Sequence, residues 1–253
     1  MAADEGRWAG RNSDKDTLRG DVWRGLEADG VNVGPVWSRI PNFAGADLAA
    51  LNLSRVPAWQ AARVVKTNPD PPQIPVRLRA LYDGKIVYAP VPELTKGFPF
   101  LRLDPAALKA KNVEFETAAT AQGFLAHGQP VAFEDMEFLD FVVVGCVAVT
   151  RSGGRTGKGG GFADLELGIF RELGKVDATT PIATTVHSSQ VVDDARLPML
   201  PHDSALHWIA TETGLIETRT AYPQPAGVDW ARVQPDQYEG IPFLKDLRAR
   251  LGG

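Results

Sequence analysis

The chain has 253 residues, a formal net charge of −4 and 44% hydrophobic residues, so it is long enough to bury a sizeable core. It has no apolar stretch of membrane-spanning length, a single cysteine, Cys146, and no long run of lysine and arginine. A membrane partner, a disulfide framework and a nucleic-acid partner are therefore not expected. The polar first residues, which include several acids, lack the pattern of a signal or transit peptide, and this favours a cytoplasmic location.

A polar tail over residues 1–12 precedes the first predicted element, a helix over 15–26 that the Ser13 side chain can cap. Lys15 and Arg19 lie four residues apart and therefore share one face of this helix. On the residues alone, a solvated surface pair is the simpler interpretation of these two charges.

Short elements follow, separated by proline and glycine. They are expected as an irregular segment over 33–45, one or two short helices over 46–62, a strand over 62–65, a helix over 76–82 and a strand over 86–89. Strand, helix and strand in this close order are typical of a βαβ unit, which places parallel strands in one sheet. The proline-rich segment 66–72 between them is expected to be an extended loop.

The middle of the chain joins an apolar run to a glycine-rich loop. Residues 141–149 predict one buried strand, and residues 162–173 predict a helix that Gly174 ends. Between them, glycines let backbone N–H groups approach an anion, and the helix N-terminus adds partial positive charge. Arg155 and Lys158 add full positive charges. The loop therefore predicts a phosphate site, although it fits neither the P-loop nor the dinucleotide fingerprint.

The last third of the chain predicts one more strand and an extension. The strand is expected over 181–186, and Gln190 after it is expected to cap backbone groups. Residues 221–253 are proline-rich and are expected to form an extension that ends in a short helix over 242–251. The predicted organisation is thus a tail, a main domain over 13–220 and this extension.

The glycine-rich loop resembles a known family signature. The 5-formyltetrahydrofolate cyclo-ligase family carries a sequence close to R-L-G-x-G-x-G-Y-Y-D before a helix. The residues that match it are Arg155, Gly157, Gly159, Gly161 and Asp164, while Phe162 and Ala163 replace the two tyrosines. The family also begins with a helix that bears K-x-x-x-R, which residues 15–19 match. The segments RIPNF and KTNPDPPQ are similar to a divergent branch, the methenyltetrahydrofolate synthetase domain-containing proteins.

The resemblance implies a fold and an activity. It implies a three-layer α/β/α fold with a mostly parallel sheet, of the NagB/RpiA/CoA-transferase-like type. It also implies conversion of 5-formyltetrahydrofolate to 5,10-methenyltetrahydrofolate with ATP and Mg²⁺. In that reaction the γ-phosphate moves to the formyl oxygen, a ring nitrogen attacks, and phosphate leaves.

The resemblance also assigns roles to residues. The implied ATP-binding residues are Lys15, Arg19, Arg155, Gly157, Lys158, Gly159, Gly160, Gly161 and Phe162, of which Arg155 and Lys158 are also catalytic. Asp164 and Asp203 are implied magnesium ligands, and Asp70 is the implied substrate contact. From the residues alone, Asp164 could instead cap the helix that follows the loop.

Three functional interpretations remain open at this point. The chain departs from the family in the proline-rich loop around Asp70, in Ala163, and in His207, which stands where the family has a second acid. The first interpretation is an authentic cyclo-ligase, and the second is an ATP-using paralogue that acts on another small heterocycle. The third is a non-catalytic regulator on the same fold, because fold alone does not decide function.

Overall fold

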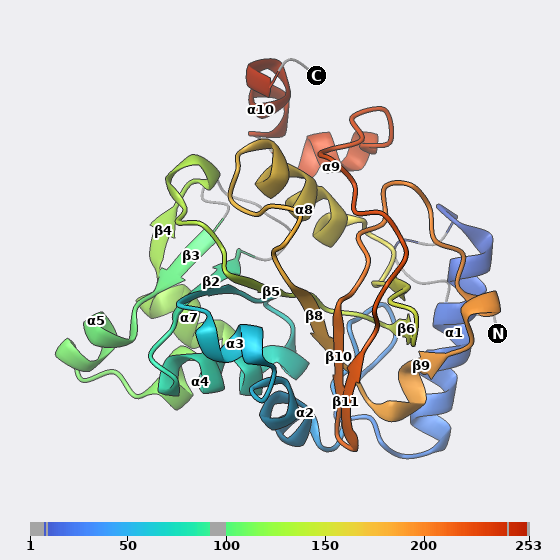
Figure 1. Ribbon diagram of the computed structural model, residues 1–253, viewed down its shortest axis with the longest axis horizontal. Helices are drawn as coiled ribbons and strands as arrows, with labels where there is room; N and C mark the ends of the chain where they lie inside the picture. The colour runs from blue at the N-terminus through green and yellow to red at the C-terminus, as the bar shows by residue number, and fades with distance from the viewer. Residues whose placement is uncertain (1–7, 9, 92–99, 242, 252–253) are drawn as a thin grey trace.

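The computed structural model describes residues 8, 10–91, 100–241 and 243–251 and shows helices on both faces of one large sheet (Figure 1). Within these residues, eight strands pair in the order β11-β10-β8-β5-β1-β2-β3-β4. They are β1 (Val64–Lys66), β2 (Ile86–Pro90), β3 (Phe100–Leu103), β4 (Gln129–Val131), β5 (Phe141–Val143), β8 (Ile182–Thr185), β10 (Trp208–Thr211) and β11 (Gly214–Glu217). Strands β10, β8, β5, β1 and β2 run parallel, and β11, β3 and β4 pair antiparallel at the edges. The predicted α/β/α fold with a mostly parallel sheet is confirmed.

Alternating side chains of the strands divide the core into two layers. Val65 and Val87 pack into a cluster with the helices on one face, whereas Val64 and Val142 pack against α8 on the other. The helices of the first face are α2 (Ala46–Leu53), α3 (Pro57–Ala61), α4 (Ile74–Tyr82), α5 (Pro105–Ala110), α6 (Phe115–Ala118) and α7 (Ala121–His127). Those above the other face in Figure 1 are α8 (Phe162–Glu172), α9 (Pro235–Gly240) and α10 (Leu244–Leu251). Such alternation is the period of two that a strand imposes on its side chains.

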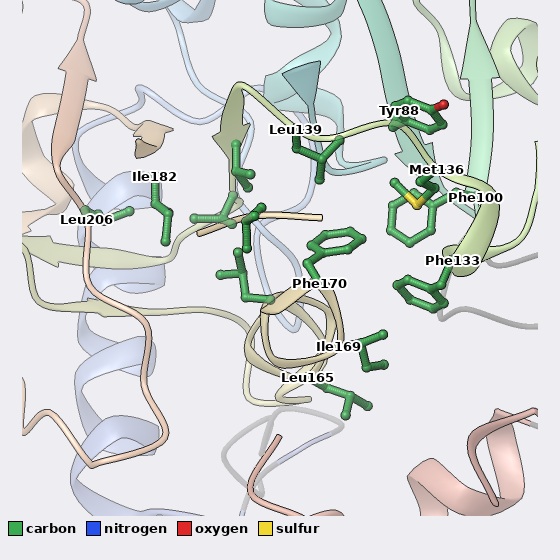
Figure 2. Packing of buried hydrophobic residues seen from close by; sticks show 14 of the residues in the cluster. Tyr88, Phe100, Phe133, Met136, Leu139, Leu165, Ile169, Phe170, Ile182 and Leu206 are labelled. Atoms are coloured by element: carbon green, nitrogen blue, oxygen red, sulfur yellow. The ribbon is translucent and has the colours of Figure 1, made fainter. Parts of the chain in front are cut away.

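Helix α8 is anchored by aromatic packing. Phe170 is fully buried, and its ring centroid lies 5.3 Å from that of Phe100 and 5.5 Å from that of Phe133. Figure 2 shows these rings grouped beside Met136, with Leu165 and Ile169 on the same helix. Aromatic rings at this separation add specific geometry to the burial of apolar area. Helix α8 is therefore held in a defined place against the sheet through Phe170, near its C-terminal end.

The predicted single strand over 141–149 is wrong. Strand β5 ends at Val143, and the chain then leaves the large sheet and forms β6 (Ala148–Thr150) in a second sheet. There, β6 pairs antiparallel with β7 (Arg155–Thr156) and parallel with β9 (Val191–Val192). The apolar run hides this change because every residue of it is buried on both sides of the break.

The break falls at Gly145, where there is no room for a side chain. A Cβ atom there would lie 3.0 Å from Ile40 and 3.1 Å from a carboxylate oxygen of Asp70. Glycine is therefore the residue that lets the backbone pass this point.

The first helix, α1 (Ser13–Ala28), packs against the second sheet. Leu18, Val22 and Trp23 pack into one buried cluster with Ala148 of β6. The N-cap is Asn12 rather than Ser13, because the Asn12 side chain accepts the backbone N–H of Lys15 at 3.0 Å. None of the helices in the described part of the chain combines the length and hydropathy needed to cross a membrane.

His207 occupies a structural position between two parallel strands. Its Nδ1 accepts the backbone N–H of Ile182, the first residue of β8, at 3.0 Å. Burial and the nearby charge of Arg171 lower the pKa of His207 below its ordinary value of 6.5. The Ile182 N–H needs a hydrogen-bond acceptor at this position, and the neutral imidazole of His207 supplies one.

This position predicts a pH dependence of stability. Because the folded pKa is lowered, the unfolded chain binds the proton more readily, so stability is present above pH 6.5 and decreases as the pH falls through the folded pKa. His207→Asn, whose amide oxygen replaces Nδ1 as acceptor, is expected to reduce this loss in urea unfolding measured from about pH 7 to about pH 5. His127→Asn, at an exposed histidine, is the control and should keep the wild-type slope. An unchanged slope in His207→Asn would contradict the assignment.

Candidate active site

A cavity of about 270 Å³ lies where α1, the loop after β7 and the start of α8 meet. It also receives the loop after β1 and residues of the C-terminal segment. All residues predicted to bind ATP, magnesium or the substrate line this cavity. They are Lys15, Arg19, Asp70, Arg155, Gly157, Lys158, Gly159, Gly160, Gly161, Phe162, Asp164 and Asp203. The fold thus brings together residues that are widely separated along the chain.

The glycine-rich loop has a backbone that most residues avoid. Gly159 and Gly161 have φ angles of 105° and 70°, which favour glycine, and Gly161 is the N-cap of α8. The Leu165 N–H donates to the carbonyl of Gly161 at 3.0 Å and closes the first helical turn. The N–H groups before Leu165 have no helical carbonyl to bind, so the start of α8 offers donors and partial positive charge to an anion.

Cationic side chains surround the loop and are themselves held in place. Arg155 is 2% exposed, donates from Nε to the Ser204 carbonyl at 2.9 Å and from Nη2 to Asp164 at 2.6 Å. Burial alone would lower the pKa of Arg155, but the charges of Asp164, Cys146 and Asp203 and the hydrogen bond to Asp164 together raise it. This guanidinium therefore stays charged inside the protein.

The two charges of α1 are buried and do not form the solvated pair that their spacing allows. Lys15 is 6% exposed and forms an ion pair with Asp203. Arg19 is 3% exposed, donates to the Thr156 hydroxyl at 2.8 Å and forms an ion pair with Asp16. Both side chains thus point from α1 into the cavity rather than into solvent.

Asp164 and Asp203 each accept hydrogen bonds through one carboxylate oxygen, and the other oxygen of Asp203 lies 3.8 Å from Nε2 of His202. Oδ1 of Asp164 accepts from Arg155 and from the Ser204 N–H at 2.8 Å. Oδ2 of Asp203 accepts from Lys15 and from the Leu200 N–H at 2.7 Å. Among the described residues, no hydrogen bond engages the second oxygen of either carboxylate. The same residues contain no cluster of three or more His, Cys, Asp or Glu side chains that could hold a metal ion by itself.

Asp70, in the loop after β1, also lines the cavity. Burial raises the pKa of its carboxyl, and the charges of Lys158, Arg77 and Lys66 partly oppose this rise. The carboxylate lies against Gly145, at the point where β5 leaves the large sheet. It therefore adds a carboxylate to the cavity lining, close enough to Lys158 of the glycine-rich loop for their charges to interact.

A buried ion pair behind Asp70 was not predicted from the sequence. Lys66 ends β1 and is fully buried, and it pairs with Glu166 of α8, which is 3% exposed. Lys66 also donates to the side chain of Asn68 at 2.6 Å. Burial raises the pKa of Glu166, and the charge of Lys66 partly opposes this rise. The available signal was the position of Glu166 four residues after Phe162, on the apolar face of the predicted helix.

The site agrees with a family match over most of the chain. The family model of the 5-formyltetrahydrofolate cyclo-ligase family matches residues 11–212. The fold and the loop define the chain as an α/β protein with a glycine-rich loop at the start of a helix. The match shows in addition that the chain belongs to this family. The resemblance that the loop predicted is confirmed, and the family is one of enzymes.

Similar proteins carry related names. The methenyltetrahydrofolate synthase domain-containing protein of Mus musculus is 37% identical over 238 residues, which cover 93% of this chain and 63% of that protein. Its Homo sapiens counterpart is 36% identical over 238 residues, with 93% and 62% covered. The 5-formyltetrahydrofolate cyclo-ligase of Mycolicibacterium smegmatis is 33% identical over 81 residues, or 32% of this chain and 38% of that protein. The chain therefore spans less than two thirds of the length of the mammalian relatives.

Solved structures with a similar arrangement include two methenyltetrahydrofolate synthetases. That of Aquifex aeolicus is 19% identical with a TM-score of 0.49 and covers 85% of this chain and 100% of its own. That of Mycoplasma pneumoniae is 11% identical with a TM-score of 0.46 and covers 79% and 99%.

The Lys66–Glu166 pair yields a stability prediction. Lys66→Met or Glu166→Leu alone leaves one buried charge without its partner and is expected to cost about 3–5 kcal/mol in urea unfolding. The double variant removes both charges and is expected to lie close to wild type. Arg219→Met, which breaks the exposed pair with Glu217, is the control and should change stability by less than about 1 kcal/mol. A double variant as unstable as either single variant would contradict this account.

Proposed function

We propose that this chain is an ATP- and Mg²⁺-dependent ligase that closes 5-formyltetrahydrofolate to 5,10-methenyltetrahydrofolate, and that it does so in the cytoplasm. The observation that carries the proposal is one cavity shared by the glycine-rich loop, by Lys15, Arg19, Arg155 and Lys158, and by three aspartates. Phosphoryl transfer depends on positioning and charge neutralisation more than on covalent chemistry by the protein, and this cavity supplies both.

The phosphates of ATP are assigned to the loop between Gly157 and Phe162. Its backbone N–H groups and the start of α8 attract negative charge, while Arg155 and Arg19 add fixed cations at its base. Lys158 is partly exposed and forms no ion pair within the described residues. Its ammonium group is therefore available to follow a phosphoryl group as it moves toward the substrate.

Magnesium is assigned to the second carboxylate oxygens of Asp164 and Asp203, because no hydrogen bond within the described residues engages either one. Two carboxylates are enough for this ion, which keeps several waters and takes its remaining ligands from phosphates. When bound, it would neutralise charge on the phosphate oxygens. Arg155 and Lys15 hold the other oxygens and so orient both carboxylates.

The folate is assigned to the part of the cavity at Asp70. A carboxylate there accepts hydrogen bonds from the ring nitrogens of a heterocycle, and the charge of Lys158 in the phosphate loop acts on it. The formyl oxygen must meet the γ-phosphate, so the substrate and phosphate sites must share one cavity, as these residues do.

A different heterocyclic substrate is the second candidate. The feature that favours it is the loop after β1, where a 3₁₀ turn over Pro71–Gln73 shapes the approach to Asp70. A non-catalytic regulator is the third, and the experiment below separates all three.

The test is an optical assay of the methenyl product with ATP, Mg²⁺ and 5-formyltetrahydrofolate. Wild type should give an ATP-dependent rise in absorbance, and Lys158→Ala and Asp164→Asn should each lower kcat by about 10²–10³-fold with the fold intact. Lys111→Ala, at an exposed lysine outside the cavity, is the control and should match wild type.

A wild-type protein that binds ATP but gives no product would favour another heterocycle. If it bound no ATP, a non-catalytic role would replace the proposal. Wild-type rates in Asp164→Asn would overturn its assignment to magnesium.

A further inference from the structure

Both ends of the described chain reach the glycine-rich loop at one atom. The carbonyl oxygen of Gly160 accepts from Nη1 of Arg11 at 2.8 Å and from Nε2 of Gln237 at 2.9 Å. Arg11 precedes α1 and Gln237 lies on α9, so the two donors come from opposite ends of the sequence. Gly160 is buried, and it lies between the two glycines with positive φ angles.

The two donors are themselves fixed. Nη2 of Arg11 binds both carboxylate oxygens of Asp236, at 2.7 and 2.6 Å. The Gln237 side chain is 4% exposed, and its Oε1 accepts the backbone N–H of Gln234 at 2.9 Å. That bond sets which way the amide faces, so Nε2 is the atom directed at Gly160. Arg11, Asp236 and Gln237 are called the terminal clamp below.

Holding this carbonyl fixes a donor of the phosphate loop. In a trans peptide unit the carbonyl of one residue and the N–H of the next point in opposite directions. The clamp on the Gly160 carbonyl therefore sets the direction of the Gly161 N–H at the start of α8. Glycines have little conformational preference of their own, so a loop rich in them needs outside contacts to keep one shape.

Two of the three clamp residues lie outside the segment that the family model matches. That match ends at residue 212, whereas Asp236 and Gln237 lie on α9. The C-terminal segment also lines the cavity with Val228, Arg232 and Val233. This chain thus builds one wall of the cavity, and the support of its loop, from residues beyond the matched core.

We infer that the terminal clamp positions the glycine-rich loop for a triphosphate ligand, with Arg11 and Gln237 acting as positioning residues through the Gly160 carbonyl. The inference rests on the proposed function in that the ligand is a chain of phosphates. Loss of the clamp leaves the sheet and α8 in place, because α8 is anchored by the packing of Phe170 on Phe100 and Phe133. Loss of the clamp releases the loop and lowers its affinity for phosphate groups.

The first measurement is hydrogen–deuterium exchange of the free full-length protein. Gln237→Ala should speed exchange of the backbone amides over 157–163 by about threefold to tenfold, which is the effect of losing about one hydrogen bond. Gln224→Ala is the matched control. Gln224 binds the same C-terminal segment to the Ala205 carbonyl and to Arg171, at 3.0 Å each, and does not contact the loop.

The second measurement is the Kd for inorganic tripolyphosphate and for ATP, by titration calorimetry. Gln237→Ala should weaken tripolyphosphate binding by about tenfold, and Gln224→Ala should not change it. Arg11→Lys is a second variant at a partly exposed site, which keeps the positive charge but cannot bind Gly160 and both oxygens of Asp236 together. It should show the same two effects at a smaller size.

The outcomes separate this inference from the proposed function. Unchanged exchange in Gln237→Ala, or faster exchange with unchanged tripolyphosphate affinity, would overturn the clamp. Wild type that binds neither probe would overturn it as well. Wild type that binds tripolyphosphate but not ATP would refute the proposed nucleotide while the clamp stands on its own two measurements.

Discussion

Each buried charge in this molecule needs a partner of opposite charge, and this requirement determines how the elements around the cavity are arranged. Removing an ion from water costs several kcal/mol, which is recovered only when a partner of opposite charge lies in contact. Lys15 meets this need with Asp203, 188 residues away, Arg155 with Asp164, and Lys66 with Glu166. Through these pairs, α1, the second sheet, β1 and α8 are held around one cavity. The cations are consequently in place before any anion arrives.

The parts of the site that the sequence predicted are those with local signals. The glycine-rich loop and α8 were predicted because glycine spacing, nearby cations and apolar residues at helical spacing all fall within about twenty residues. The strands and helices around β1 and β2 were found for the same reason. Asp70 was placed in the cavity by family resemblance, and its inner position depends on the contact with Gly145.

What the sequence did not reveal depends on contacts between distant segments. The apolar run after Phe141 shows its change from one sheet to the other only through Gly145, because both sheets bury the run equally. The partner of Glu166 lies a hundred residues earlier, at Lys66. A buried carboxylate on a helix predicts that a cation exists, but only the packing of α8 on β1 identifies which cation.

The Arg11–Asp236 contact has a consequence for the order of folding. The two residues are separated by 225 positions, so bringing them together orders nearly the whole chain, and such distant contacts form slowly. The sheets and their helices contain much closer partners and can assemble before this contact exists. We therefore expect the phosphate loop to acquire its final shape late in folding, so that the capacity to bind a ligand reports a completely folded chain.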